Sequence, residues 1–418
     1  MKNFFGVKSE FGKNVVTLLS GSVIGQIIVF LFIPILARLY DKDLFGIYYI
    51  FVASFNILKR VSTLRFELAI IISKNDRRAI NSLVISIIIL ILTSLFFLLL
   101  AFLMKCLNFD SEWFVKLNNF TLLLIAILFF NGMTEIINAW NNRKKEYKLI
   151  SITKLVYSST VTTSQAGLSF TILKKIGLII GAVLARFLAM LTIILASLKD
   201  IKQNLKFVNI RLMKAIFIRF FKIPIFNTLI NVVNNLSNEL PIYLFSFFFS
   251  PAISGLYGMA NKLFATPTDL LGNSISQVFY QQASDNHSNK QKLLPLINRT
   301  HKNILKLALL LTIGYTAISP FIHYLLGSKW IGIEMYLFMI IPIVISNMFL
   351  QPVSPSYTIL EKQNIIFIWQ IISLIVRGVS IALGFWLFHS VFYALLFFML
   401  TTTLYKILIV LWIRKISR

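Results

Sequence analysis

One stretch of the sequence, residues 222–249, carries asparagines at a spacing that places them on a single face of a helix. Four of them recur at i, i+4, i+7 and i+11: Asn227, Asn231, Asn234 and Asn238. At about 100° per residue they fall within a sector of about 60°. Amides facing lipid tails would cost free energy, so the stripe must face protein or water. It predicts a hydrated wall; hydrogen bonding between helices is the plainer alternative.

The stretch 253–281 repeats this pattern with ionisable residues included. Its polar residues recur at i, i+4, i+7, i+11, i+14 and i+18: Lys262, Thr266, Asp269, Asn273, Ser276 and Tyr280. Two consecutive helices with matching polar stripes predict a water-filled cavity. Packing between polar helix faces without a cavity is the alternative.

Three cations are expected to be buried in apolar stretches. Arg186 and Arg377 lie about ten residues from either end of theirs, where a charge costs roughly 2.5–3.5 kcal/mol on insertion scales. Together with Lys262 they would make the cavity mildly cationic. Arginine suits bidentate recognition of phosphate or carboxylate, and lysine acts as a movable point charge. A structural ion pair with a nearby acid is the alternative role for each.

Two carboxylates, Glu239 and Asp269, are candidates for ion coupling. A carboxylate in a wall of low dielectric constant can carry a proton or a sodium ion through a transport cycle. The alternative for them is neutralisation of Lys262. Lys406 lies nearer the end of its apolar stretch, and we expect its side chain to reach the lipid headgroups.

The elements that must position these residues are membrane-spanning helices. Of 418 residues, 57% are hydrophobic and 13% are charged, whereas soluble domains carry about 25% charged residues. This excludes a soluble enzyme, a disordered basic protein and a soluble nucleic-acid-binding protein. At about 20 apolar residues per span, the sequence predicts an all-α polytopic membrane protein with twelve spans: 15–36, 44–64, 80–103, 117–138, 150–172, 176–198, 222–249, 253–281, 304–326, 333–353, 365–387 and 390–412.

The distribution of lysine and arginine predicts the orientation. The two termini and the connections on their side hold 28 of the 41 Lys and Arg residues, and the other side holds 7. Cytoplasmic segments carry such an excess, so we expect both termini in the cytoplasm. The basic connection 199–222 mixes cations with apolar residues. It is expected to lie in the membrane interface and contact anionic headgroups, or to be a plain linker.

An offset of 209 residues, half the chain, reveals a short internal repeat. The segment 44–48 (LFGIY) corresponds to 253–257 (ISGLY), which aligns Gly46 with Gly255. With six spans in each half, the halves enter the membrane in the same direction. Parallel repeats of this kind bind substrate between them in transporters. We therefore expect two six-helix bundles, residues 1–209 and 210–418, around a central cavity.

No pattern in the sequence predicts an enzyme, a metal site or a cofactor. Cys106 is the single cysteine, which excludes an intrachain disulfide, a structural zinc site and a CxxC motif. The four histidines show no HxxxH or HExxH spacing. Walker, GxGxxG and GxSxG motifs are absent from the sequence.

Several short segments near the amino terminus form a recognisable pattern: 18–21 (LLSG), 34–40 (PILARLY), 41–46 (DKDLFG), 65–70 (RFELAI) and 73–76 (SKND). This pattern resembles the amino-terminal signature of Wzx-type polysaccharide flippases, the O-antigen translocases. These belong with the multidrug and oligosaccharidyl-lipid exporters. The length and the twelve spans fit that family over the whole chain. Five residues match positions of the pattern, with an expected gating or structural role: Arg38, Asp43, Gly46, Arg65 and Glu67.

The resemblance implies a transport function. It implies two bundles around a cavity that opens alternately to each side, and transport of a polyprenyl-diphosphate-linked oligosaccharide from the cytoplasmic to the periplasmic leaflet. It also implies a location in the bacterial inner membrane and association with a glycan polymerase and a chain-length regulator. One departure is that only Arg186 lies deep in the amino-terminal half, where the family places more cations. The alternatives are a cation-coupled multidrug exporter and a membrane glycan polymerase or ligase.

Overall fold

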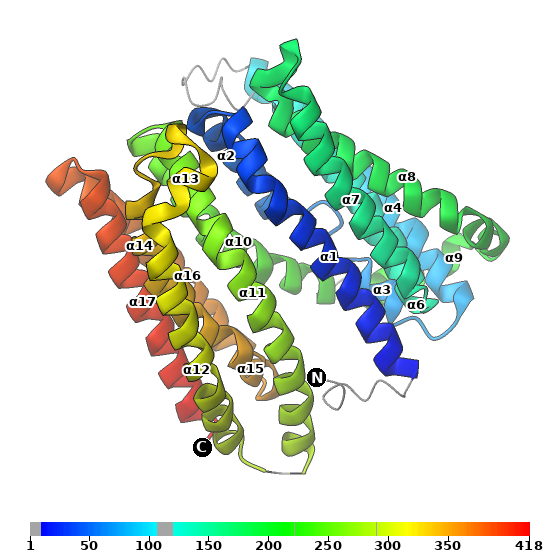
Figure 1. The fold of residues 1–418 in the computed structure, drawn as a ribbon. Coiled ribbons are helices and arrows are strands. Elements are labelled where there is room, and N and C mark those ends of the chain that lie inside the picture. Colours follow the sequence, from blue (N-terminus) through cyan, green and yellow to red (C-terminus); the bar gives the residue numbers. More distant parts are fainter. Residues whose placement is uncertain (1–9, 107–119, 221, 290) are drawn as a thin grey trace. The chain divides into compact units, whose positions relative to one another are not determined.

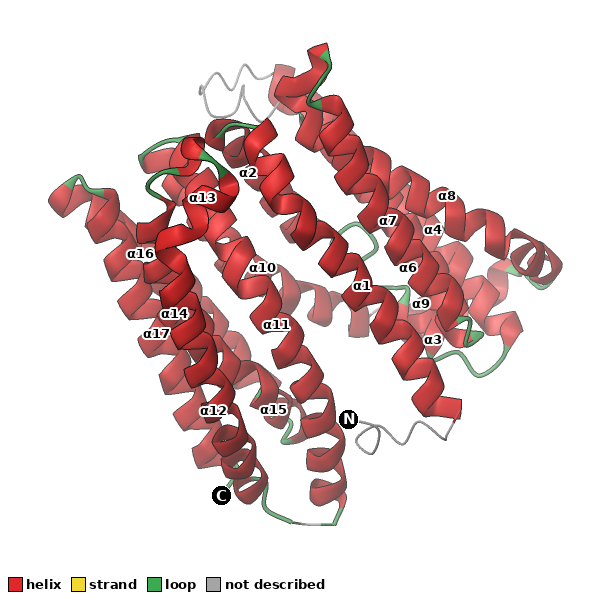
Figure 2. Ribbon diagram, in the orientation of Figure 1, coloured by secondary structure: helices red, strands yellow, loops and turns green. Residues whose placement is uncertain are grey.

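The computed structural model describes residues 10–106, 120–220, 222–289 and 291–418. Within these ranges every regular element is a helix (Figures 1 and 2). A long helix lies at each of the twelve expected spans: α1 (Glu10–Leu39), α2 (Lys42–Leu58), α4 (Asp76–Cys106), α6 (Thr121–Arg143), α7 (Tyr147–Leu168), α8 (Gly177–Leu205), α10 (Lys222–Phe248), α11 (Pro251–Ser288), α12 (Leu294–Ile318), α14 (Ile333–Val353), α16 (Gln363–Phe388) and α17 (Val391–Ile416).

The described part of the chain contains eight candidate membrane spans, as judged by length and composition alone. The other four long helices differ from them for physical reasons. Helix α2 has 17 residues, and α7, α10 and α11 carry runs of polar residues. Polar residues inside a span are tolerated where they face protein or water. The protein is therefore an all-α polytopic membrane protein, as the sequence predicts.

The chain forms two compact units. Unit 1 comprises Met1–Tyr40 and Phe51–Val232, and unit 2 comprises Asp41–Ile50 and Val233–Arg418. One boundary falls between α1 and α2, and the other two fall inside α2 and α10, so each of these two helices contributes residues to both units.

In unit 1, α7 packs between α1 and α8, and α6 packs against both α4 and α8. Figure 1 shows α1 and α7 running alongside each other. A buried cluster around Trp140 joins α4, α6 and α8; it includes Ile80, Leu83, Ile136 and Ile193. Three short elements complete the unit: α3 (Leu68–Ile71), the 3-10 turn Ile172–Ile176 and α9 (Ile210–Phe220).

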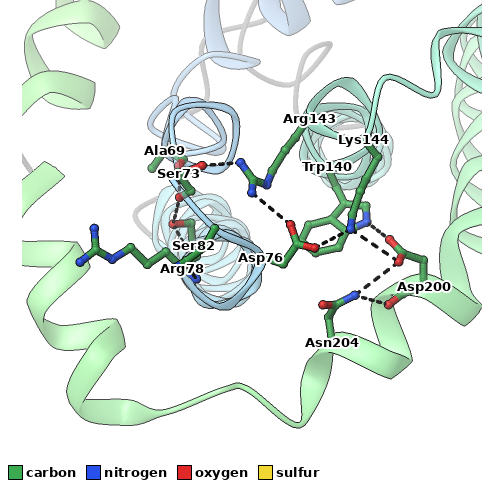
Figure 3. A network of polar contacts seen from close by, with 11 residues as sticks. Ala69, Ser73, Asp76, Arg78, Ser82, Trp140, Arg143, Lys144, Asp200 and Asn204 are labelled. Carbon is green, nitrogen blue, oxygen red and sulfur yellow. Dashed lines mark hydrogen bonds and ion pairs between the residues drawn. The ribbon is translucent and has the colours of Figure 1, made fainter.

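A polar network ties together one end of α4, α6 and α8 (Figure 3). The Asp76 carboxylate accepts hydrogen bonds from Arg143 at 3.0 Å and from Lys144 at 2.7 Å. Trp140 Nε1 donates to Asp200 at 2.7 Å. These residues belong to connections that the positive-inside rule assigns to one side of the membrane. The structure brings the three connections together.

In unit 2, α14 packs against α11, α12 and α17, and α16 packs against α17. The backbone N–H of Leu294 donates to the carbonyl of Ser417 at 3.0 Å, and Arg414 donates to Asn298 at 2.8 Å. The start of α12 and the end of α17 therefore meet. The short elements are the 3-10 turns Ser319–Phe321 and Ser328–Trp330, α13 (Ile322–Leu326) and α15 (Pro355–Ile359).

Candidate functional site

A cavity of about 490 Å³ lies inside unit 2, walled by residues of α10, α11, α14, α16 and α17. This volume falls within the range of small-molecule binding sites, about 300–1,000 Å³. Amides are prominent among its polar groups: Asn234, Asn238, Asn261, Asn273, Asn347, Gln351 and Gln370. The cavity therefore offers many donors and acceptors to a polar solute.

The wall from α10 contains part of the asparagine stripe expected from the sequence. Asn234 and Asn238 line the cavity together with Ser237. Asn231 lies in the portion of α10 that belongs to unit 1 and is not in this wall. The side chain of Asn227 lies outside the residues that the structure describes.

The wall from α11 is a stripe at four-residue intervals. It comprises Tyr257, Asn261, Ala265, Asp269 and Asn273, of which Asp269 and Asn273 are expected from the sequence. Lys262, one residue along from Asn261, is half-buried and not part of this wall. The predicted stripe misses Asn261 because it begins one residue later, although the four-residue spacing from Asp269 would have identified it.

Arg377, from α16, is the best-defined cation of the cavity and is only 8% exposed. Its Nη1 donates to the Ser237 carbonyl at 2.6 Å, to Ser237 Oγ at 3.2 Å and to Asn238 Oδ1 at 2.8 Å. Ser237 Oγ also donates to Ser373 at 3.0 Å. These bonds fix one edge of the guanidinium. Its Nε is buried and has no acceptor in the described part of the chain.

Lys406, from α17, is a second cation in this wall, and the expectation that it reaches headgroups is wrong. It is 8% exposed, and its Nζ donates to the Ile343 carbonyl of α14 at 3.0 Å. Arg377 and Asp269 lie within electrostatic range of its amine. The sequence places Lys406 near the end of a span, but only the packing of α14 beside α17 shows that it faces inward.

Asp269 is the acid of this wall. Its Oδ1 accepts a hydrogen bond from Asn347 Nδ2 at 3.0 Å. One helical turn along, Gln351 Nε2 donates to Asn273 Oδ1 at 2.8 Å, so α11 and α14 are joined by two amide contacts. Glu239, the other expected coupling residue, is half-buried on α10, within electrostatic range of Tyr257 and outside the cavity wall.

The ionisable groups of the wall are two basic side chains, Arg377 and Lys406, and one acidic side chain, Asp269. A guanidinium and an ammonium in a partly desolvated site favour an anion with several oxygen atoms. The surrounding amides suit hydroxyl groups. Tyr257, Tyr405 and Phe398 add aromatic surface. The arrangement can therefore hold a solute that combines a phosphate-like anion with a polyhydroxylated part.

Arg186, the deep cation of unit 1, is held differently. Its guanidinium lies 3.9 Å from the centroid of the Tyr157 ring and 5.5 Å from that of Phe55. Its Nε is buried without a partner in the described residues. Within those residues no salt bridge to Arg186 is found, so stacking on aromatic rings stabilises this charge in place of the structural ion pair.

The amino-terminal signature residues have varied environments. Arg38 and Asp43 are exposed where α1 ends and α2 begins, and Glu67 is 5% exposed. Arg65 lies within electrostatic range of Glu67 and has a left-handed backbone, with φ of 57°. Asp76, the acid of the signature segment 73–76, pairs with Arg143 and Lys144.

Gly46, the fifth signature residue, packs tightly against α11. A Cβ at this position would overlap the carbonyl group of Pro251. Glycine is therefore required there for close helix approach.

The fold is similar to those of a flippase and a transporter of known structure. The lipid II flippase MurJ in an inward closed conformation aligns with a TM-score of 0.68 and 17% identity, over 96% of this chain and 90% of that one. A multidrug resistance MATE family transporter of the MOP superfamily, inward-facing, aligns with a TM-score of 0.71 and 14% identity, over 97% and 98%.

A model of the polysaccharide biosynthesis protein family matches residues 35–335. The chain belongs to this family. No protein of curated function matches the sequence. The family and the fold together agree with the resemblance to polysaccharide flippases in the amino-terminal segments.

Proposed function

We propose that this protein is a flippase for a polyprenyl-diphosphate-linked oligosaccharide, an O-antigen or similar repeat unit. It moves the glycan from the cytoplasmic to the periplasmic leaflet of the bacterial inner membrane by alternating access. Membership of the polysaccharide biosynthesis family and the MOP-type fold support this proposal. The flippase MurJ, whose name states that it acts on lipid II, supports a lipid-linked substrate.

The observation that carries the proposal is the environment of Arg377. Its guanidinium has a buried Nε without an acceptor in the described residues, in a cavity rich in amides that also contains Lys406. A diphosphate provides several anionic oxygens for such a pair of cations. In this proposal the diphosphate binds near Arg377 and Lys406, and the sugars contact Asn234, Asn238 and Asn273. The polyprenyl tail stays in the lipid.

Asp269 is the coupling residue that this cavity favours. It is the carboxylate in the wall, and Lys406 lies within electrostatic range of it. Binding of a proton or a sodium ion would change the charge that the two wall cations experience, and with it the affinity for an anionic substrate. Glu239 lies outside this wall and is the second candidate. Lys262 and Arg186 are secondary candidates for substrate contact.

The proposed test uses cells that lack this protein but keep the rest of a surface-glycan pathway. We expect a complete single repeat unit on its polyprenyl diphosphate to accumulate in the cytoplasmic leaflet. Export of single units without polymer would instead indicate a polymerase or ligase. Unchanged glycan lipids would overturn the proposal. Returning a tagged copy of the protein to these cells allows co-purification, which tests for a glycan polymerase and a chain-length regulator as partners.

Arg377→Lys tests the site itself. Lysine keeps the charge but loses the planar guanidinium, whose Nη1 donates to both Ser237 and Asn238. We expect this variant to restore little surface glycan while accumulating to wild-type protein levels. Lys415→Gln is the matched control, because it removes an exposed cation of unit 2 outside the cavity. Full complementation by Arg377→Lys would contradict the assigned role.

A cation-coupled multidrug exporter is the second candidate, because MATE family transporters share the fold. It predicts an acidic cavity for cationic drugs, whereas this wall contains Arg377 and Lys406 against Asp269. Drug susceptibility of the same deletion cells distinguishes the two. A lowered minimal inhibitory concentration with normal glycan lipids would favour the exporter.

A further inference from the structure

Unit 1 contains a second pocket that the proposed function does not use, an apolar groove of about 480 Å³ between α4 and α9. Ile85, Ile88 and Leu92 line it from α4, at i, i+3 and i+7 on one helical face. Met213 and Phe217 line it from α9. Its volume falls in the range of ligand sites, and its lining is almost entirely hydrocarbon.

One face of helix α9 packs against the rest of unit 1, and the neighbouring face lines the groove. Ile216 is buried in a cluster with Phe66, Ile85 and Ile89, which fixes one face of α9 against α3 and α4. At about 100° per residue, Met213 and Phe217 lie beside that face. The ring of Phe217 also stacks on Phe66, with centroids 6.0 Å apart. The groove is thus a preformed feature of the packed helices.

Lys214 supplies the charge at this groove. It belongs to the lining, is exposed, and has no salt-bridge partner in the described part of the chain. The segment 201–238 contains no Asp or Glu but carries six cations: Lys202, Lys206, Arg211, Lys214, Arg219 and Lys222. Of these six, Lys214 lines the groove, and its ammonium is complementary to an anionic headgroup.

The groove continues onto a surface that faces lipid in a membrane protein. Its residues Ile88 and Leu92 are 43% and 60% exposed, and α4 continues with exposed Leu95, Phe96 and Leu99. Exposure of this hydrocarbon surface to water would cost free energy, whereas contact with a lipid chain would not. The occupant must therefore reach the groove from the bilayer.

We propose that this groove binds one acyl chain of an anionic phospholipid, whose headgroup phosphate contacts Lys214. The apolar lining contacts the acyl chain, and the ammonium of Lys214 at the rim favours an anionic headgroup. The exposed face of α4 provides the route of entry from the bilayer. The site is separate from the cavity of unit 2, and its occupation does not depend on the glycan carried.

The experiment is native mass spectrometry of the full-length protein in detergent with added phosphatidylglycerol or phosphatidylcholine of equal chain length. We expect phosphatidylglycerol to be retained about fivefold better, the effect of about one cation near a headgroup. Lys214→Gln should remove this preference, and Lys202→Gln, on the same basic connection, should keep it.

Leu92→Trp should fill the groove and lower retention of both lipids, whereas Leu99→Trp, equally exposed on α4 but outside the groove, should not.

Location is checked with a phosphatidylglycerol that carries a photoreactive group in its chain. We expect crosslinks to peptides covering 85–93 and 210–217. Equal retention of the two lipids, a preference that survives Lys214→Gln, or crosslinks elsewhere would overturn the proposal. Displacement of phosphatidylglycerol by undecaprenyl phosphate at lower concentration would assign the groove to an isoprenoid chain instead. None of these results depends on glycan transport, so this proposal and the proposed function can fail separately.

Discussion

Gly46 of α2 and Gly255 of α11 pack against each other within unit 2. A Cβ on Gly255 would lie 3.0 Å from the Gly46 nitrogen and would overlap the Lys42 carbonyl, and a Cβ on Gly46 would overlap the Pro251 carbonyl. Each glycine thus meets the residue four positions before the other. The two glycines are 209 residues apart, the offset of the short repeat in the sequence, and the two contacts are reciprocal.

This contact predicts that either glycine resists even the smallest enlargement. In Gly46→Ala and Gly255→Ala the new methyl group meets backbone oxygen, which no side-chain rotation can relieve. We expect each to destabilise the protein by about 1–3 kcal/mol, seen as a lower Tm in detergent. Gly314→Ala is the control, since nothing lies within 4 Å of its Cβ position and alanine favours helix. Wild-type Tm values for both interface variants would refute the tight contact.

The membrane-spanning helices could be predicted because each span needs a long apolar run. The positions of the helix ends could not be predicted in this way. The sequence predicts spans at 253–281 and 304–326, but α11 continues to Ser288 and α12 begins at Leu294. Hydropathy locates the part of a helix inside the bilayer. Outside the bilayer, backbone hydrogen bonds and capping residues determine where a helix begins and ends. An example is Ser250, whose side chain accepts a hydrogen bond from the Ile253 N–H at the start of α11.

The site was predictable where it depends on the spacing within one helix. Asn234, Asn238, Asp269 and Arg377 were expected to line a cavity and do so. Lys406 could not be predicted, because its acceptor is the Ile343 carbonyl of another helix. The amide partner of Asp269, Asn347, comes from another helix, α14, and the spacing within α11 does not identify it. Contacts between helices cannot be predicted from the spacing of residues within each helix.

The proposed coupling role predicts the behaviour of Asp269→Asn. The amide has the size of the carboxylate and can still bond Asn347, but it cannot gain or lose a proton at neutral pH. In proteoliposomes with fluorescent lipid-linked oligosaccharide, wild-type flipping should respond to an imposed proton or sodium gradient. We expect the variant to show slower flipping that no gradient changes. Ser274→Ala, exposed on the same helix outside the cavity wall, is the control; a gradient-responsive Asp269→Asn would exclude this residue as the coupling site.

The network at the start of α4, outside the expected span 80–103, predicts a pH dependence of stability. The hydrogen bond from Lys144, together with that from Arg143, holds the pKa of Asp76 below its ordinary value of 3.8. The unfolded state then binds the proton first, so the stabilisation is present above the unfolded pKa and is lost as pH falls through the folded pKa. We expect Tm to fall on acidification below about pH 4, and Asp76→Asn to flatten this part of the profile. Asp285→Asn, exposed on α11, should leave the profile as in the wild type.

The pairing of Asp269 with Lys406 predicts non-additive effects of charge removal. Lys406 is 8% exposed, and each charge lies within electrostatic range of the other. Asp269→Asn leaves the ammonium beside Arg377 without a compensating anion, and Lys406→Gln leaves the carboxylate without this cation. We expect the double variant to lose less stability than the sum of the two single variants, with a coupling free energy of about 0.5–3 kcal/mol. Chemical denaturation of the three variants in detergent measures it, and strict additivity would show that the two charges do not interact.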